Sequence, residues 1–269
     1  MRAREVACTL LLEVIEPASV VIQVAAARRP GSMISERLDV VNNTDPVPAQ
    51  ELGGQVGGRQ HLVRVQIGTM QVSYEATIAA GTGTAVAVSD EQRVAALRPS
   101  RYCPSDRLRG FALAQFGELP AGLPRVRAIC DFVWRHIAYQ SETSAHTTDA
   151  VDTLLAGRGV CRDFAHLVAA LCRAVDVPAR IASVYAPGLS PMDFHAVVET
   201  DIDGSWWTWD PTRSAPRPTM ARIATGRDAA DTAFATVIAG RAELRQLEII
   251  AVTGGDLPLD DHDQLHVLD

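Results

Sequence analysis

Residues 157–175 read GRGVCRDFAHLVAALCRAV, and this stretch decides the fold. Glycines precede Cys161, and the residues after it repeat apolar side chains at helical spacing up to Val175. The pattern therefore predicts a helix that begins at the cysteine. Free N–H groups and the dipole at a helix N-terminus favour an anion, which predicts partial thiolate character for the thiol. The glycines also leave room for a bulky acyl group, so we interpret Cys161 as a nucleophile.

The other four cysteines are interpreted differently. Cys172 lies three helical turns beyond Cys161, roughly 16 Å away, and is expected to pack in the core. Cys8 and Cys130 sit in apolar periodic segments and are expected to be small buried hydrophobic residues. Cys103 is given no role. An odd number of cysteines without a CxxC pair predicts neither a disulfide framework nor a zinc site.

Composition describes an ordinary globular chain of 269 residues, 47% hydrophobic and 21% charged. The 25 basic and 32 acidic residues give a net charge of −7 without a basic cluster, which argues against nucleic acid or an anionic membrane as partner. The first residues are typical of a strand rather than a cleavable leader, and no apolar run is long enough to span a membrane. We expect a cytoplasmic protein. No HExxH, P-loop or GxSxG motif occurs, so neither a metal nor a cofactor is expected.

A thiol nucleophile needs an imidazole partner, and His195 is the candidate because it heads an apolar strand after a loop rich in proline and glycine. His166 lies on the nucleophile helix but points away from Cys161, which suits a surface or packing role. An orienting carboxylate is expected from Asp210. A hairpin turning at residues 203–204 would set Asp210 nearly opposite His195.

The rest of the chain predicts an α+β protein in two domains. Residues 1–95 contain short Val/Ile/Leu-rich runs between turn-formers, which predicts an antiparallel sandwich or sheet with a hairpin turning near residues 68–69. Residues 96–269 first predict helices near 105–117, 123–139, 150–156 and 161–175, and then antiparallel strands at 179–185, 194–202 and 205–210. Signals weaken after Pro218, and from Asp256 we expect a loop and a terminal strand.

Four blocks of sequence resemble the transglutaminase-like superfamily in order and spacing. They read GVCRDFAHL at 159–167, VPAR at 177–180, HAVVE at 195–199 and WDPT at 209–212. The resemblance is to bacterial cysteine protease or amidase members with an accompanying β-rich N-terminal region. It implies a papain-like core on which Cys161 is the nucleophile at a helix start and His195 and Asp210 lie on adjacent strands. Many members carry an aromatic residue two places after the histidine, where this chain has Val197, so the cleft wall is expected to differ.

Three further residues are candidates for cleft or oxyanion support. Tyr139 and Gln140, at the end of the preceding helix, are candidates for a second oxyanion donor beside the backbone N–H of Cys161. Trp209 is a candidate cleft wall because it adjoins Asp210. Asp163 is expected to be structural, because acidic residues are common in a first helical turn.

The expected activity is acyl transfer on an amide or peptide bond through a thioester on Cys161. Water as acceptor makes the enzyme a protease, amidase or deamidase, and an amine makes it a transglutaminase. The expected partner is a protein or peptide bearing an amide, and the sequence leaves the oligomeric state open. The alternative is a catalytically silent domain of the same fold that serves as a scaffold or interaction module.

Overall fold

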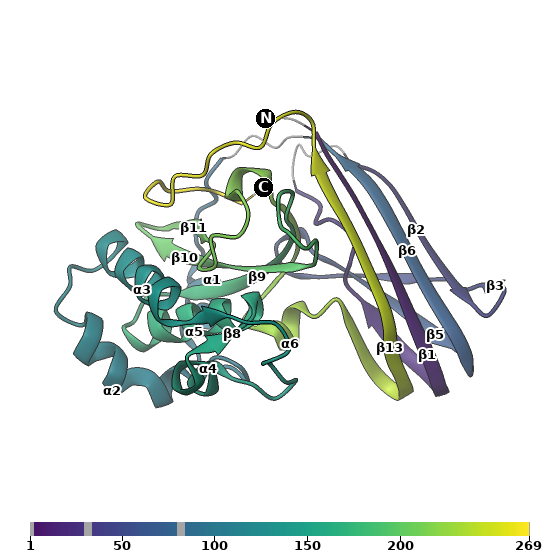
Figure 1. The fold of residues 1–269 in the computed structure, drawn as a ribbon, viewed down its shortest axis with the longest axis horizontal. Helices are drawn as coiled ribbons and strands as arrows, with labels where there is room; N and C mark the ends of the chain where they lie inside the picture. Colours follow the sequence, from purple (N-terminus) through teal and green to yellow (C-terminus); the bar gives the residue numbers. More distant parts are fainter. Residues whose placement is uncertain (1–2, 30–33, 80–83, 269) are drawn as a thin grey trace.

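The computed structural model describes residues 3–29, 34–79 and 84–268. Figure 1 shows a curved sheet on one side of the molecule, helices on the other, and a smaller sheet between them. The strands and helices of the first part are β1 (Arg4–Ile22), β2 (Ile34–Asn42), β3 (Asp45–Pro46), β4 (Gln50–Gly53), η1 (Gln55–Gly57), β5 (Arg59–Val65) and β6 (Gly68–Ile78). The remainder are α1 (Asp90–Leu97), α2 (Ser105–Phe116), α3 (Leu123–His136), β7 (Ala138–Tyr139), α4 (Ala150–Ala156), β8 (Arg158–Gly159), α5 (Cys161–Ala174), β9 (Ala179–Tyr185), β10 (His195–Ile202), β11 (Ser205–Trp209), η2 (Arg217–Thr219), β12 (Ala221–Gly226), α6 (Ala229–Thr232) and β13 (Ala235–Thr253).

The large sheet is built around β1, whose side chains alternate between the core and the opposite face. Along one edge β1 pairs antiparallel with β13 over almost its whole length. Its other edge pairs with β6 near the start of β1 and with β5 near its end. Strands β2 and β3 continue the sheet beyond β6, and β4 continues it beyond β5. The predicted β-rich N-terminal part is therefore a single antiparallel sheet rather than a sandwich.

The predicted hairpin near residues 68–69 is wrong. Strands β5 and β6 do not pair with each other but follow one another along the same edge of β1. The break between them faces the register shifts of β1 around Pro17, which cannot donate a ladder hydrogen bond. The Asn42 side chain holds the break by accepting from Gln66 N at 2.7 Å and donating to Gln66 O at 3.2 Å. Polar residues and glycine therefore mark the break between two strands on the same edge in the same way as they mark a hairpin turn.

The smaller sheet has the order β11-β10-β9-β12, with all neighbours antiparallel. Helix α5 packs against β10 and β9, and α2, α3 and α4 contact α5 from the other sides. Every residue from Asp163 to Ala174 is buried, so α5 is a central core helix rather than one with a single apolar stripe. The predicted order, helices first and antiparallel strands afterwards, is confirmed, as is the α+β class.

Two segments near the end of the chain depart from simple expectation. Strand β13 returns to the large sheet and pairs with β1, so this sheet takes a strand from beyond the predicted division at 95/96. That division stays a prediction. Residues 254–268 form no regular secondary structure. The loop expected from Asp256 is therefore present in these residues, and the terminal strand is not. These residues are held by side chains and isolated backbone hydrogen bonds instead.

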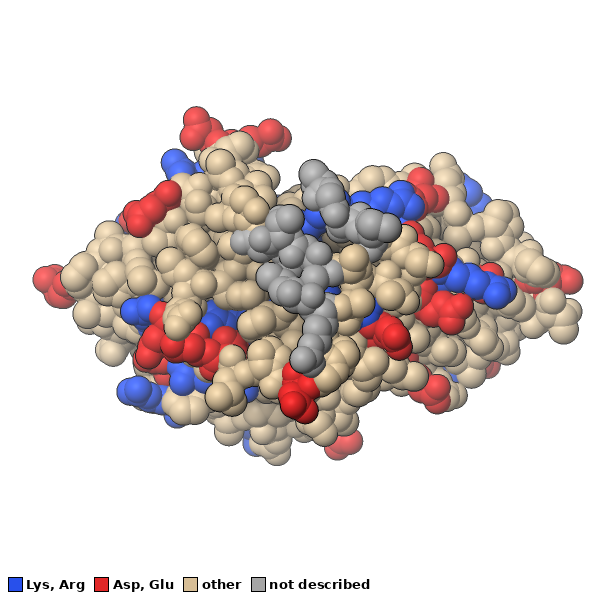
Figure 2. Space-filling view, turned by 90° about the horizontal axis from the view of Figure 1, so that it is seen from above, with Lys and Arg blue, Asp and Glu red and all other residues tan. Residues whose placement is uncertain are grey.

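Charged residues of both signs are interspersed on the face of the molecule seen in Figure 2. In the described residues, no helix combines the length and the apolar character that a membrane crossing requires.

Candidate active site

Cys161 is the first residue of α5, after the short parallel ribbon formed by β7 and β8. Val160 has extended backbone angles, and its N–H donates to Asp163 Oδ2 at 2.9 Å. Val160 has no side-chain acceptor, so only this half of a capping box forms. Gly159 lets the chain enter the helix closely, because a Cβ there would lie 2.7 Å from the Cβ of Asp163. The thiol is partly accessible and lies 3.9 Å from the carbonyl oxygen of Phe194.

His195 and Asp210 come from neighbouring strands. The hairpin turns at residues 203–204 as predicted, and β10 pairs with β11 from Val198 opposite Trp209 to Ile202 opposite Ser205. Continued by one pair, this register sets Asp210 opposite Val197, diagonal to His195 and on the same face. His195 Nε2 lies 3.1 Å from Asp210 Oδ2, and both side chains are buried. Neither imidazole nitrogen has a well-aligned hydrogen bond, so the contact is an ion pair when His195 is protonated.

His195 and Asp210 each stabilise the charged form of the other. Burial alone would lower the pKa of His195, but Asp210 and the Cys161 side chain outweigh it and raise the pKa to about 10. Burial alone would raise the pKa of Asp210, but His195 and hydrogen bonds from Thr212 hold it below its usual value. The buried imidazole therefore keeps its proton through neutral pH.

Asp210 is also fixed from behind. Its Oδ1 accepts from the backbone N–H of Thr212 at 3.0 Å and from the Thr212 hydroxyl at 2.8 Å. Its Oδ2 accepts from Ser214 N at 3.2 Å and faces His195. The loop that follows β11 thus folds around the carboxylate and sets its direction.

The remaining thiols and His166 lie in the core. Cys8, Cys103, Cys130 and Cys172 are all buried, so Cys161 is the single accessible thiol among the five. Burial raises the pKa of Cys172 to about 12. His166 is fully buried, stacks on Tyr102 and accepts from Ala229 N at 3.1 Å, which is the packing role and not the surface one.

The three predicted supporting residues have different surroundings. Tyr139 is 55% exposed, and its phenol lies beside the backbone of Cys161. Gln140 donates its backbone N–H to Gly159 O at 3.0 Å, so only its exposed side-chain amide is free to act as a donor. Trp209 is buried and donates its indole N–H to Thr200 Oγ1 at 2.8 Å, which places it in the core beneath the site.

Asp193 is a further charged residue of the site that the sequence analysis missed. It acts electrostatically on both Tyr139 and His195, which places it at the mouth of the site. Its Oδ1 accepts from Phe194 N at 2.7 Å, and partial enclosure raises its pKa. The available signal was its position two residues before His195, in the loop that leads into β10.

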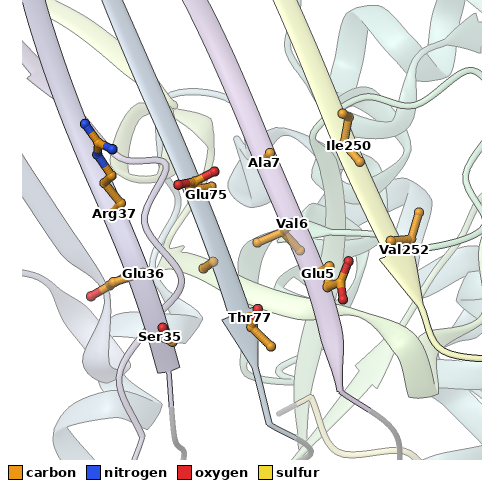
Figure 3. Close-up of a pocket in the computed structure, with 11 residues that line it drawn as sticks. Glu5, Val6, Ala7, Ser35, Glu36, Arg37, Glu75, Thr77, Ile250 and Val252 are labelled. Atoms are coloured by element: carbon orange, nitrogen blue, oxygen red, sulfur yellow. The ribbon is translucent and has the colours of Figure 1, made fainter.

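One hollow lies well away from these residues. The hollow in Figure 3 lies on the outer face of the large sheet, and its lining includes Glu5, Arg37, Glu75, Ile250 and Val252. None of the site residues lines it. Within residues 3–29, 34–79 and 84–268, no three His, Cys, Asp or Glu side chains are grouped so as to hold a metal ion.

Comparison with known proteins finds a family model, a solved structure and a sequence relative to which this chain is similar. The family model described as the transglutaminase-like superfamily matches residues 112–211. A crystal structure from Cytophaga hutchinsonii, described as a "putative cysteine protease", is 32% identical with a TM-score of 0.87, covering 96% of this chain and 93% of that one. An uncharacterized protein of Mycobacterium leprae is 30% identical over 124 residues, a match that spans 41% of this chain and only 43% of that relative.

Proposed function

Because this chain belongs to the transglutaminase-like superfamily, we propose that it is a cysteine-dependent enzyme that cleaves amide or peptide bonds with Cys161, His195 and Asp210. The observation that carries the proposal is the buried 3.1 Å contact of His195 with Asp210, beside the single accessible thiol. Similarity over nearly the full length to the Cytophaga protein supports a cysteine-protease-like activity and a protein substrate.

The proposed reaction begins with the thiol proton on the imidazole. His195 Nε2 faces Asp210, so Nδ1 is the nitrogen available to Cys161. The sulfur attacks the substrate carbonyl carbon, and the C=O electron pair moves to oxygen. When the tetrahedral intermediate collapses, the C–N bond breaks, His195 protonates the leaving amine and a thioester remains on Cys161. Asp210 holds the imidazole in this orientation and stabilises its positive charge.

The oxyanion needs two donors, and the Cys161 backbone N–H is the first. We propose the Tyr139 hydroxyl as the second, because the phenol lies beside that same N–H. The backbone N–H of Gln140 is already bonded to Gly159 O, which supports Tyr139 over this group.

Water is the proposed acceptor for the thioester, in line with the described activity of the similar Cytophaga protein. A specific observation favours an amine as the second candidate. Among the described residues, the Asp193 carboxylate forms no salt bridge with an arginine, and it could hold the ammonium group of an incoming amine. Hydrolysis and transfer use the same triad and differ only in this last step.

Selective labelling of Cys161 tests whether the domain is an enzyme or a silent scaffold. Low iodoacetamide at pH 6 to 7 should alkylate Cys161 and spare the four buried thiols, as read by peptide mass spectrometry. His195→Ala should slow this labelling strongly, while His136→Ala, an exposed histidine on α3, should leave it unchanged. A scaffold reading is favoured instead if Cys161 reacts no faster than a free cysteine and is insensitive to His195.

An amine-incorporation assay separates the two acceptors. A glutamine-containing peptide and a labelled primary amine are incubated with the native chain and with Cys161→Ala. All 25 basic residues of the chain are arginine, so no lysine of the enzyme itself can act as acceptor. Ammonia release or chain cleavage without label supports hydrolysis, and label on the peptide that is lost in Asp193→Asn supports transfer. Activity that persists in Cys161→Ala would contradict both the hydrolase and the transferase proposal.

The cellular compartment of the protein is also a proposal. The free, buried thiols fit a reducing compartment, and we propose the cytoplasm on that ground.

A further inference from the structure

The segment of residues 254–268, here called the strap, runs from the end of β13 back across the smaller sheet. Figure 1 shows it in yellow, passing near β11 before it reaches the end of the chain. Val267 and Leu268 are buried, and Leu268 packs with Val184, Val197 and Met220 on the face of the sheet away from α5. The strap is therefore anchored in the core although it has no regular structure.

The strap and η2 hold one residue of β11 at its free edge. The backbone N–H of Thr208 donates to His266 O at 2.7 Å, and its carbonyl accepts from Arg217 Nη1 at 2.9 Å. Strand β11 is the last strand of its sheet, so these two bonds take the place of a neighbouring strand. Thr208 lies two residues before Asp210 in the chain. The position of its backbone therefore determines where the Asp210 side chain leaves the backbone.

Arg217 is itself held by the strap. The Arg217 side chain is 1% exposed and forms a bidentate pair with Asp260, with Nε to Oδ2 at 2.9 Å and Nη2 to Oδ1 at 2.8 Å. The backbone N–H of Arg217 also donates to Asp260 Oδ2 at 2.9 Å, and Nη2 donates to Asp261 O at 2.8 Å. Bidentate pairs of this kind fix direction as well as distance. The guanidinium can reach the Thr208 carbonyl in only one orientation, and Asp260 sets it.

Little free space remains between these parts. A cavity of about 20 Å³ lies behind Asp210, bounded by α3, the loop after β11 and the strap, which is room for about one water. The charged and titratable side chains around it, apart from Asp210 itself, are Arg127, Cys130, Asp131, Arg213, Arg217, His262 and Asp263. Movement of the strap would therefore be transmitted to the Asp210 loop rather than absorbed.

We propose that Asp260 is a positioning residue for Asp210, acting through the Arg217 guanidinium and the Thr208 carbonyl. The proposal rests on the triad function given above. Asp260 touches no reacting atom and supplies no proton. It fixes the end of β11 so that the Asp210 carboxylate meets His195, and misplacement of catalytic groups by about 1 Å costs on the order of a hundredfold in rate.

The test compares Asp260→Asn with Asp256→Asn, which removes the same charge from an exposed position of the same segment. The readout is the pH dependence of Cys161 alkylation by iodoacetamide, measured well below the melting temperature of each variant. We expect Asp260→Asn to react about tenfold more slowly at pH 6, with the midpoint moved up by about one pH unit, because one unit corresponds to a tenfold change in the protonation equilibrium. Asp256→Asn should match the native chain.

A purely structural role predicts a different result. Melting of Asp260→Asn would then fall, while the alkylation profile of the folded protein stayed at the native midpoint, and this outcome overturns the proposal. If Asp260→Asn does not fold, Asp260→Glu takes its place in the test. This variant keeps the charge and should move the midpoint of the alkylation profile in the same direction by a smaller amount. A native alkylation profile for Asp260→Glu would overturn the proposal. Absence of selective labelling in the native chain would instead sink the triad function.

Discussion

The Asp210 carboxylate accepts hydrogen bonds on both oxygens, and the oxygen that accepts from Ser214 N also faces His195. Sequence reasoning could predict this pairing because a tight turn at residues 203–204 places the two strands in register. It could not predict the bonds from Thr212 and Ser214 or the Arg217–Asp260 pair, because these depend on loops that cross in space. Asp193 was not predicted because it lies in a loop, and a loop has no hydrophobic periodicity that would show which way its side chains point.

Replacement of Asp210 by asparagine is expected to abolish most activity while keeping the shape of the site. Without the carboxylate, burial lowers the pKa of His195 and the imidazole loses its charge near neutral pH. Loss of an orienting carboxylate in such triads costs about 10²- to 10⁴-fold in kcat. Steady-state rates from pH 5 to 9 measure the effect, with Asp90→Asn at the exposed start of α1 as the control. An Asp210→Asn variant with native kcat would remove Asp210 from the mechanism.

Removal of the Tyr139 hydroxyl tests the proposed oxyanion donor. We expect Tyr139→Phe to lower kcat by on the order of 10²-fold with little change in KM, because the donor acts only on the transition state. Gln140→Ala should have a much smaller effect, since its amide lies in solvent. If Gln140→Ala lost more activity than Tyr139→Phe, the two assignments would have to be exchanged.

At the scale of elements, the start of α5 is held by a carboxylate rather than by a capping residue before it. Asp163 is buried, accepts from Val160 N at 2.9 Å and from the Ser144 hydroxyl at 2.9 Å, and pairs with Arg162. It therefore ties the loop after β7 to the helix. The expectation that Asp163 stabilises the helix start fits these contacts.

Asp163→Ala should destabilise the fold by about 2–3 kcal/mol, because it leaves the partly buried Val160 N–H and Ser144 hydroxyl without their acceptor. Asp152→Ala is the matched control. Asp152 has the same place in the first turn of α4 but is exposed, and its loss should cost about 0.5–1 kcal/mol. Urea denaturation of both variants measures the difference, and equal losses would contradict the assigned role.

The elements most easily predicted were those with short-range patterns. The segments expected at 105–117 and 179–185 correspond closely to α2 and β9, because each has its own periodicity and end signals. Strand β13 gave little signal because most of its side chains are exposed, which weakens the alternation of apolar residues. The break between β5 and β6 was misinterpreted as a turn because only the partner strand β1 distinguishes the two.

For the whole molecule, protonation of buried groups sets a pH window of greatest stability. Glu199 is buried between Arg222 and Arg180; burial alone would raise its pKa, but the two guanidiniums lower it from 4.5 to about 2. Its contribution is present above pH 4.5 and is lost as pH falls toward 2. The pKa of His195 rises from 6.5 to about 10, so its contribution is full below pH 6.5 and is lost as pH rises toward 10. Once the thiol is removed, as in Cys161→Ser, stability should therefore be greatest between about pH 4.5 and 6.5.

The alkaline limb can be assigned to one residue. In a Cys161→Ser background, the free energy of unfolding should fall by up to about 1.4 kcal/mol per pH unit between pH 6.5 and 8.5, because only the folded chain keeps the His195 proton. In the native chain the thiol gives its proton to His195, and the two changes cancel. This range lies below the titration of ordinary thiols. His195→Gln should flatten the slope, and the exposed His136→Gln should not. A Cys161→Ser variant whose stability is constant over this range would contradict the raised pKa of His195.

The pairing of β1 with β13 also has a consequence for synthesis on the ribosome. Arg4 meets Thr253, so β1 leaves the exit tunnel long before β13, the strand that covers its second edge. Contacts so distant in sequence close slowly, and an open strand edge recruits other chains meanwhile. Slowing translation should therefore lengthen the time for which the nascent chain needs a chaperone on β1, until β13 has left the exit tunnel and can pair with it.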